Sequence, residues 1–130
     1  VEARRHGVVP VIVSPLSKFD RKTLKPTSVM DAYGKNAGKA AELTECAFID
    51  LWSMSKDIIN AVGEDGLKVY SDGTHTADYG GYLFSLCIAK GIKENKLELA
   101  KYLSDDLINI DTKNPTPRFS DFKVPVEKRR

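Results

Sequence analysis

The chain has 130 residues, and its 20 lysines and arginines against 18 aspartates and glutamates leave a net charge of +2. This near balance gives no electrostatic footprint for a polyanion, so we expect no nucleic-acid partner. Hydrophobic residues at 42% and charged residues at 29% are typical of one globular domain and exclude a disordered tail or a fibrous repeat. No apolar run approaches the roughly 20 residues that span a bilayer, so we expect no membrane partner either.

The first residues are typical of the end of a helix. Arg4 and Arg5 place cations in a last turn, and Gly7 follows in the position that most often closes a helix. His6 lies in the same turn, where we expect a structural role. A helix this short does not nucleate alone, so the sequence predicts that an earlier part of the helix and of its domain lies upstream of Val1. The alternative is a flexible polar N-terminus with a chance glycine.

Two short apolar segments predict parallel strands. Residues 8–13 form an unbroken β-branched run, which indicates a strand that is covered on both faces. Pro10 lies near its start, where a strand tolerates proline. Residues 46–51 predict a second buried strand that ends at Asp50, whose side chain we expect to cap the following helix.

Helical segments separate and follow these strands. We predict helices over about 29–45, over 53–62, and from Asp78 to a stop at Gly91, with a short extended piece at 67–70. The alternation of helix and strand, with right-handed crossovers, predicts an α/β fold in which a parallel sheet lies between helices.

The chain divides into a domain and a tail. Residues 1–103 carry the periodic segments and form the predicted domain. Residues 104–130 contain Asn114-Pro115-Thr116-Pro117, and we predict an extended, weakly held C-terminal tail. The tail ends in Lys128-Arg129-Arg130, three charges that we interpret as a solvated chain end.

One histidine has the context of a catalytic residue. His75 follows Asp72 by three residues, in a loop between an apolar segment and a helix start. An acid at this spacing can accept a hydrogen bond from one ring nitrogen and leave the other nitrogen free as a base. Such a base can remove the proton of a serine hydroxyl, and the acid stabilises the imidazolium that forms.

Two other interpretations of the same residues stay open. An Asp-x-x-His match occurs by chance, so His75 is also compatible with an ordinary exposed loop histidine. A metal site formed by Asp72, His75 and Asp78 would offer at most three ligands, which makes a metal-dependent hydrolase the weaker hypothesis. We therefore expect neither a metal nor another cofactor.

The block from Ser71 to Gly81, Ser-Asp-Gly-Thr-His-Thr-Ala-Asp-Tyr-Gly-Gly, resembles the last conserved block of the SGNH or GDSL-like hydrolases. It is most similar to their rhamnogalacturonan acetylesterase branch, and residues 7–15 and 48–51 resemble the two strands that precede the block there. The resemblance implies the C-terminal portion of a flavodoxin-like three-layer sandwich. It also implies that Asp72 and His75 belong to a Ser-His-Asp triad that removes acyl groups from carbohydrates, and it favours a secreted or periplasmic protein.

The sequence departs from this family in three places. It has no Gly-Asp-Ser block, no Gly-x-Asn-Asp block and no Gly-x-Ser-x-Gly elbow, so the nucleophile and the oxyanion donors of the family are absent. We interpret four local candidates for a nucleophile as structural: Ser14 in a turn, Ser71 too close to His75, and Cys46 and Cys87 in the core.

These observations lead to two hypotheses. In the first, the chain is part of a serine esterase, inactive alone, whose missing N-terminal half joins it along an apolar sheet edge and supplies the serine. Its substrate would be an acylated carbohydrate. In the second, the chain is a noncatalytic binding or interaction module that keeps this half of the fold.

Overall fold

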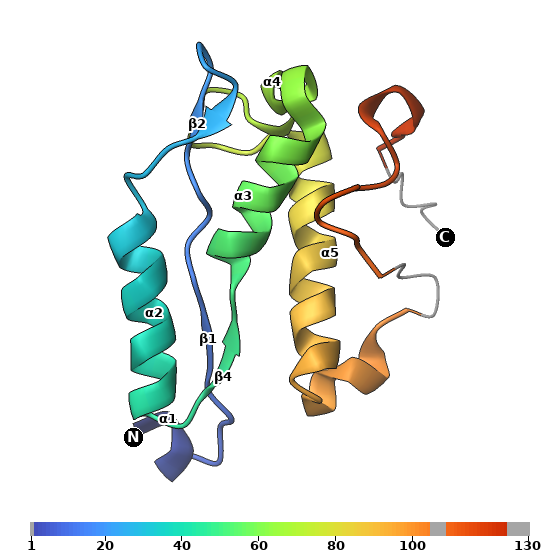
Figure 1. The fold of residues 1–130 in the computed structure, drawn as a ribbon. Helices are drawn as coiled ribbons and strands as arrows, with labels where there is room; N and C mark the ends of the chain where they lie inside the picture. The colour runs from blue at the N-terminus through green and yellow to red at the C-terminus, as the bar shows by residue number, and fades with distance from the viewer. Residues whose placement is uncertain (1, 105–108, 125–130) are drawn as a thin grey trace.

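Two parallel strands form the centre of the fold, and helices pack around them. The computed structural model describes residues 2–104 and 109–124 (Figure 1). The elements are, in chain order, α1 (Glu2–Arg5), β1 (Val11–Val13), β2 (Phe19–Asp20), β3 (Lys25–Pro26), α2 (Asp31–Leu43), β4 (Ala47–Ile49), α3 (Leu51–Val62), the 3-10 turn η1 (Gly63–Asp65), α4 (Gly66–Val69), α5 (Asp78–Glu94), and the 3-10 turns η2 (Glu98–Tyr102) and η3 (Phe119–Asp121).

The sheet lies between α2 and α5, as Figure 1 shows. Strands β1 and β4 are parallel, with Ile12 opposite Phe48. Successive side chains of a strand point to opposite faces, and β4 follows this rule. The ring of Phe48 lies beside Gly38 of α2, whereas Ile49 packs against Gly91 of α5. The predicted α/β class with a parallel sheet between helices is therefore confirmed.

Helix α5 runs three residues past the predicted stop, to Glu94. Gly91 is buried inside the helix, where a β-carbon would lie 2.6 Å from Cγ2 of Ile49. This glycine therefore serves close packing on β4 and does not end the helix. The side chain of Asn95 follows the helix end and donates a hydrogen bond of 2.8 Å to the carbonyl oxygen of Phe48.

The predicted cap at Asp50 is confirmed. Its carboxylate accepts a hydrogen bond of 3.1 Å from the backbone amide of Ser53 in the first turn of α3. Ser14 follows β1 and joins the same corner, because its hydroxyl donates to the Asp50 carboxylate and accepts from the Trp52 amide at 2.8 Å. This corner fixes the carboxyl ends of both strands.

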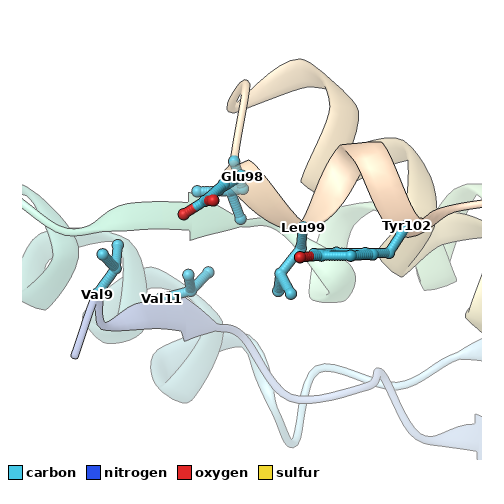
Figure 2. A pocket seen from close by; sticks show the side chains of 6 residues that line it. Val9, Val11, Glu98, Leu99 and Tyr102 are labelled. Carbon is cyan, nitrogen blue, oxygen red and sulfur yellow. The ribbon is translucent and has the colours of Figure 1, made fainter.

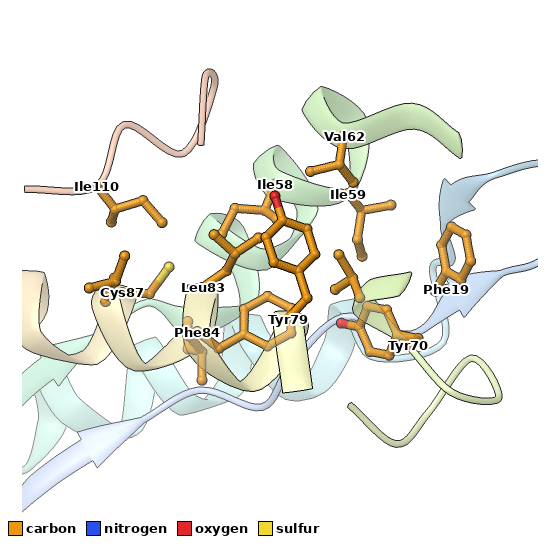
Figure 3. Packing of buried hydrophobic residues seen from close by; sticks show 13 residues of the cluster. Phe19, Ile58, Ile59, Val62, Tyr70, Tyr79, Leu83, Phe84, Cys87 and Ile110 are labelled. Carbon is orange, nitrogen blue, oxygen red and sulfur yellow. The ribbon is translucent and has the colours of Figure 1, made fainter. Parts of the chain in front are cut away.

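The main hydrophobic core lies where α3, α4 and α5 meet (Figure 3). Tyr70 is fully buried, stacks on Phe19 with ring centroids 5.7 Å apart, and donates a hydrogen bond of 2.7 Å to the carbonyl oxygen of Ser17. Burial raises the pKa of its hydroxyl. A buried side chain of this size contributes roughly 1.5–3 kcal/mol of transfer free energy, so this contact anchors the loop that follows Tyr70.

The extended piece that we predicted at 67–70 is wrong for residues 67–69 and correct only for Tyr70, whose backbone is extended and bridges to Thr76. Gly66 to Val69 form a helical turn, α4. Val69 and Tyr70 are both fully buried, whereas an extended segment would send neighbouring side chains to opposite faces. A glycine at position 66 permits this turn, because a β-carbon there would lie 2.8 Å from the Phe19 ring.

The first apolar run is less covered than predicted. Regular strand structure begins only at Val11, and Val8 and Val9 are 54% and 76% exposed. Within the described residues β1 pairs with β4 alone, so its other edge has no neighbouring strand. Val13, at the end of the strand, is also exposed. The expectation of an uncovered apolar sheet edge thus agrees with the structure.

The predicted weakly held tail is wrong for residues 109–124. This segment has little regular structure, but Ile110 and Pro115 are buried. Its Pro117 carbonyl oxygen accepts a hydrogen bond of 2.9 Å from the Tyr79 hydroxyl, and the ring of Phe122 contacts that of Tyr79 with centroids 5.2 Å apart. This hydrogen bond and the aromatic contact hold the segment against α5. The basic residues Lys128-Arg129-Arg130 lie outside the described residues.

Two adjacent glycines of α5 give a test of the fold. A β-carbon on Gly80 would overlap the carbonyl oxygen of Val69, whereas one on Gly81 would meet nothing within 4 Å. We expect Gly80→Ala to lower the free energy of unfolding by about 1–3 kcal/mol, since α5 must move away from α4. Gly81→Ala should raise it by up to about 1 kcal/mol through helix propensity. Urea denaturation measures both, and equal effects of the two variants would contradict the close approach.

Candidate functional site

The loop from Ser71 to Ala77 lies between α4 and α5, and both of its ends are tied to the core. The amide of Ala77 donates to the carbonyl oxygen of Val69 at 2.9 Å, and Tyr70 and Thr76 form an isolated antiparallel bridge. Within the loop, the Ser71 amide donates to the His75 carbonyl oxygen at 2.9 Å. The loop is therefore a closed turn that is fixed at its base.

Gly73 joins the tip of this turn to β2. Its φ angle is +98°, in the region that favours glycine, and a β-carbon there would lie 2.6 Å from the carbonyl oxygen of Phe19. The Gly73 carbonyl oxygen accepts a hydrogen bond of 2.9 Å from the Phe19 amide. Gly73, which lies between Asp72 and His75, therefore has a structural role: it lets the turn pack closely against Phe19.

Asp72 and His75 come together as predicted. The distance from Oδ2 of Asp72 to Nδ1 of His75 is 2.6 Å. The other carboxylate oxygen, Oδ1, accepts from the backbone amides of His75 at 2.8 Å and Thr74 at 2.9 Å. One carboxylate therefore closes the turn and orients the ring at the same time.

These hydrogen bonds keep Asp72 ionised. The backbone amide of His75, its ring and the backbone amide of Thr74 hold the pKa of the Asp72 carboxyl well below its ordinary range. The folded loop therefore favours the carboxylate over the acid. With a depressed folded pKa, its contribution to the stability of the loop is present above the unfolded value of about 3.9 and is lost as the pH falls through the folded value.

The arrangement leaves one ring nitrogen of His75 available for chemistry. A neutral imidazole that donates Nδ1–H to Asp72 has Nε2 as an acceptor. No hydrogen bond of the described residues uses Nε2, and the side chain is 77% exposed. The pair can therefore act as an oriented base, provided that a hydroxyl from elsewhere comes within reach of Nε2.

The serines near the site are engaged in other contacts. Ser14 is 2% exposed, and its hydroxyl donates a hydrogen bond to the Asp50 carboxylate. The hydroxyl of Ser71 donates at 3.1 Å to the backbone carbonyl of His75 and not to its ring. Both serines thus have the structural roles that we predicted.

The two cysteines are free and differ in environment. Cys87 is fully buried, and burial raises the pKa of its thiol to about 12. Cys46 is only half-buried, and its sulfur lies 3.6 Å from the Arg4 guanidinium and 3.2 Å from the Thr44 hydroxyl. The prediction of a core position is therefore correct for Cys87 and wrong for Cys46, which lies in the turn before β4.

The proposed third metal ligand does not join the pair. Asp78 begins α5, and among residues 2–104 and 109–124 no three histidine, cysteine or acidic side chains are arranged to hold a metal ion. The pair of Asp72 and His75 would give a metal only two protein ligands, which is fewer than a stable site requires.

An open groove of about 420 Å³ begins one residue beyond His75. It combines polar and aromatic side chains from the start of α5 and from the C-terminal segment. The residues that line it include Thr76, Asp78, Tyr82, Ser85, Phe122 and Val124. Sequence reasoning missed this groove, because the contact of Phe122 with Tyr82 joins segments 40 positions apart, with ring centroids 5.3 Å apart.

The chain was compared with known proteins at three levels. No family model, no curated protein and no solved structure gave a significant match. Within the described residues, no helix combines the length and the apolar character that crossing a bilayer requires.

The tautomer of His75 tests the geometry of the pair. At a pH where the ring is neutral, we expect the Nδ1–H form, because Asp72 accepts from Nδ1. The ring of His6 provides an internal control, since its Nε2 faces Glu2 at 3.3 Å and should carry the proton. Nitrogen-15 NMR distinguishes the two forms. Asp72→Asn should abolish the Nδ1–H preference of His75 and leave His6 unchanged; an Nε2–H tautomer at His75 in the unsubstituted chain would contradict the geometry.

Thiol labelling tests the assignment of the cysteines. In the native chain, Ellman's reagent should react rapidly with Cys46 and only upon unfolding with Cys87, since a buried thiol with a pKa of about 12 forms little thiolate. Cys46→Ser should remove the rapid phase. Equal rates at both thiols in the folded chain would show that Cys87 is not in the core.

Proposed function

We propose that this chain supplies the His-Asp half of a serine esterase site that removes acetyl or other acyl groups from carbohydrates. In this proposal His75 is the general base and acid, and Asp72 orients it. The observation that carries the proposal is the hydrogen bond of 2.6 Å between Nδ1 of His75 and an Asp72 carboxylate that two backbone amides hold in place. The resemblance of residues 71–81 to the SGNH hydrolases gives this pair its role.

The reaction follows from the charges of the pair. Nε2 of His75 accepts the proton of a serine hydroxyl that a segment outside this chain provides, while the serine oxygen bonds to the acyl carbon of the ester. The imidazolium is stabilised by Asp72, which stays ionised, and it then gives its proton to the leaving sugar oxygen. Water releases the acyl group from the serine through the same two proton transfers in turn. The oxyanion donors, like the nucleophile, would come from the other segment.

The groove beside the loop supports a carbohydrate substrate. A sugar ring offers hydroxyls at its edges and an apolar face, and it binds where polar groups and aromatic rings alternate. The groove provides the hydroxyl of Thr76 and the carboxylate of Asp78 next to the rings of Tyr82 and Phe122. Because Thr76 directly follows His75, a sugar in this groove would be within a short distance of the loop that carries the base.

A second candidate is a noncatalytic interaction module. The exposed apolar residues at the edge of β1 favour it, because uncovered apolar surface marks a site of association. An interaction module needs no nucleophile, so this hypothesis predicts no esterase activity in the completed domain. A single assay of ester hydrolysis therefore distinguishes it from the esterase.

The esterase proposal is tested by supplying the missing part. The coding region upstream of Val1 would be expressed together with this chain, either as one polypeptide or as two chains. Hydrolysis of p-nitrophenyl acetate and of acetylated oligosaccharides would then be measured. We expect activity that His75→Ala lowers by about 10³-fold or more and Asp72→Asn by about 10²–10⁴-fold.

His6→Ala is the matched control, because the chain has two histidines and the ring of His6 pairs with Glu2 in α1. It should leave the rate unchanged. Activity that survives His75→Ala would contradict the assignment of the base. A completed domain without any esterase activity would favour the interaction module.

A further inference from the structure

The β2–β3 hairpin lies against the loop that carries His75, at the end of the fold where this loop joins α4 to α5 (Figure 1). The Phe19 amide donates to the Gly73 carbonyl oxygen at 2.9 Å. From the turn of the hairpin, the guanidinium of Arg21 donates a hydrogen bond of 2.7 Å to the carbonyl oxygen of Ser71. The hairpin therefore holds the loop at two points, one through its backbone and one through the Arg21 side chain.

The base of this hairpin is fixed in the core. The Ser17 amide donates at 2.9 Å to the hydroxyl of Ser55 in α3, and the Ser17 carbonyl oxygen accepts from the Tyr70 hydroxyl. The ring of Phe19 is buried and stacks on that of Tyr70. The hairpin cannot move without disturbing these contacts, so it is a rigid support for the loop.

The turn that carries Arg21 is closed by hydrogen bonds of its own. One carboxylate oxygen of Asp20 accepts from the amides of Lys22 at 2.8 Å and Thr23 at 3.2 Å. The Leu24 amide donates to the Asp20 carbonyl oxygen at 2.8 Å. The backbone of Arg21 lies inside this turn, so the position from which its side chain extends is fixed.

The hydrogen bond from Arg21 acts on the peptide group directly before Asp72. The Ser71 carbonyl belongs to the planar peptide that joins Ser71 to Asp72, so a bond that fixes this oxygen also fixes the direction in which the chain enters Asp72. The amide and the hydroxyl of Ser71 both donate to the His75 carbonyl oxygen, inside the loop. Bonds inside the loop determine its shape, whereas the bond from Arg21 determines its direction relative to the hairpin.

This direction matters because the hairpin belongs to the edge of the sheet. The hairpin follows β1, whose carboxyl end is fixed together with that of β4 by the bond between Ser14 and Asp50. In α/β folds, functional groups gather outside the carboxyl ends of the strands. The His75 loop belongs to α4 and α5, and its contacts with the hairpin tie it to this edge.

We propose that Arg21 is a positioning residue for His75. Its guanidinium holds the peptide between Ser71 and Asp72, and thereby the Asp72 carboxylate, in the orientation that meets Nδ1 of the His75 ring. Because its hydrogen bond is to the backbone of the loop, Arg21 acts through Asp72 and not on reacting atoms. The consequence for catalysis rests on the proposed function, whereas the geometric part concerns this chain alone.

The expected effect is modest, because Arg21 is exposed. Exposed polar contacts contribute little to the stability of a fold. Loss of one hydrogen bond changes a local equilibrium by about two- to tenfold. We therefore expect the loss of Arg21 to open the loop by this factor and to leave the urea midpoint of the chain nearly unchanged.

The test compares Arg21→Met with Arg21→Lys in the intact chain. Methionine keeps an apolar stem without a donor, whereas lysine keeps a cationic donor. In Arg21→Met, solvent-exchange NMR should show about two- to tenfold faster exchange of the Thr74 and His75 amides, which donate to Asp72. The Nδ1–H tautomer of the neutral His75 ring should lose population in nitrogen-15 NMR. Arg21→Lys should restore most of both signals.

Two controls separate positioning from a general loosening of the fold. Arg4→Met removes an exposed guanidinium that donates to the Glu45 carbonyl oxygen at 2.8 Å, a bond of the same kind elsewhere in the chain. Leu99→Ala removes apolar surface from a groove of about 320 Å³ between β1 and η2 (Figure 2). Helix α5, about 25 Å long, separates η2 from the His75 loop. Neither control should change the exchange at Thr74 or the His75 tautomer.

In the completed domain, Arg21→Met should lower kcat by about two- to tenfold and leave KM unchanged, because Arg21 orients the base and does not bind the substrate. A rise in KM with an unchanged kcat would contradict a positioning role.

Three NMR results would overturn the proposal. The first is unchanged amide exchange and an unchanged His75 tautomer in Arg21→Met. The second is an equal change in Arg4→Met, which would show a general loosening. The third is an equal loss in Arg21→Lys, which would show that the donor is not the cause. None of these measurements needs esterase activity, so the expected NMR changes together with an inactive completed domain would refute the proposed function alone.

Discussion

The candidate site depends on the hydrogen bonds that the Asp72 carboxylate accepts. One of its oxygens accepts two backbone amides, and the other accepts the His75 ring at 2.6 Å. The first oxygen determines the path of the turn, and the second determines the orientation of the ring. Because the same group does both, the geometry of the ring is inseparable from the fold of the loop. The ionised state of Asp72, which its depressed pKa maintains, is common to both tasks.

Two close contacts between backbone segments hold this turn against the rest of the fold. Gly73 contacts the Phe19 carbonyl, and Gly80 lets the first turn of α5 lie against the Val69 carbonyl. Tyr70, buried directly before the loop, anchors its start in the aromatic core. An exposed histidine can thus have a defined direction, because the residues on either side of its loop are among the most buried of the described chain.

The sequence predicted the features that local chemistry decides. The cap at Asp50 and the pairing of Asp72 with His75 need only a few consecutive residues, and both are present. The alternation of helices and strands followed from hydrophobic periodicity, and the parallel sheet followed from that alternation. In each case the hydrogen-bonding groups are close in sequence, or the hydrophobic pattern repeats along the segment.

The features that the sequence did not predict depend on distant partners. Residues 66–69 adopt a helical turn because the core that receives Val69, together with the following Tyr70, includes Phe19 and α5. Ile110 and Phe122 are held by α5, although nothing in their own segment has a helical or strand period. Nor did the apolar run at residues 8–13 reveal that Val8 and Val9 precede the regular strand and are largely exposed. These features depend on tertiary contacts, which secondary-structure propensity and hydrophobic periodicity do not encode.

The central claim is that His75 faces the attacking atom of a serine esterase, with Asp72 behind it. The most direct measurement is a structure of the completed domain after a fluorophosphonate has modified its serine. The account predicts that Nε2 of His75 lies within hydrogen-bond reach, about 3.2 Å or less, of the modified serine oxygen, with Nδ1 still bonded to Asp72. A modified serine that pairs with another base, or a His75 ring that faces solvent in that complex, would contradict it.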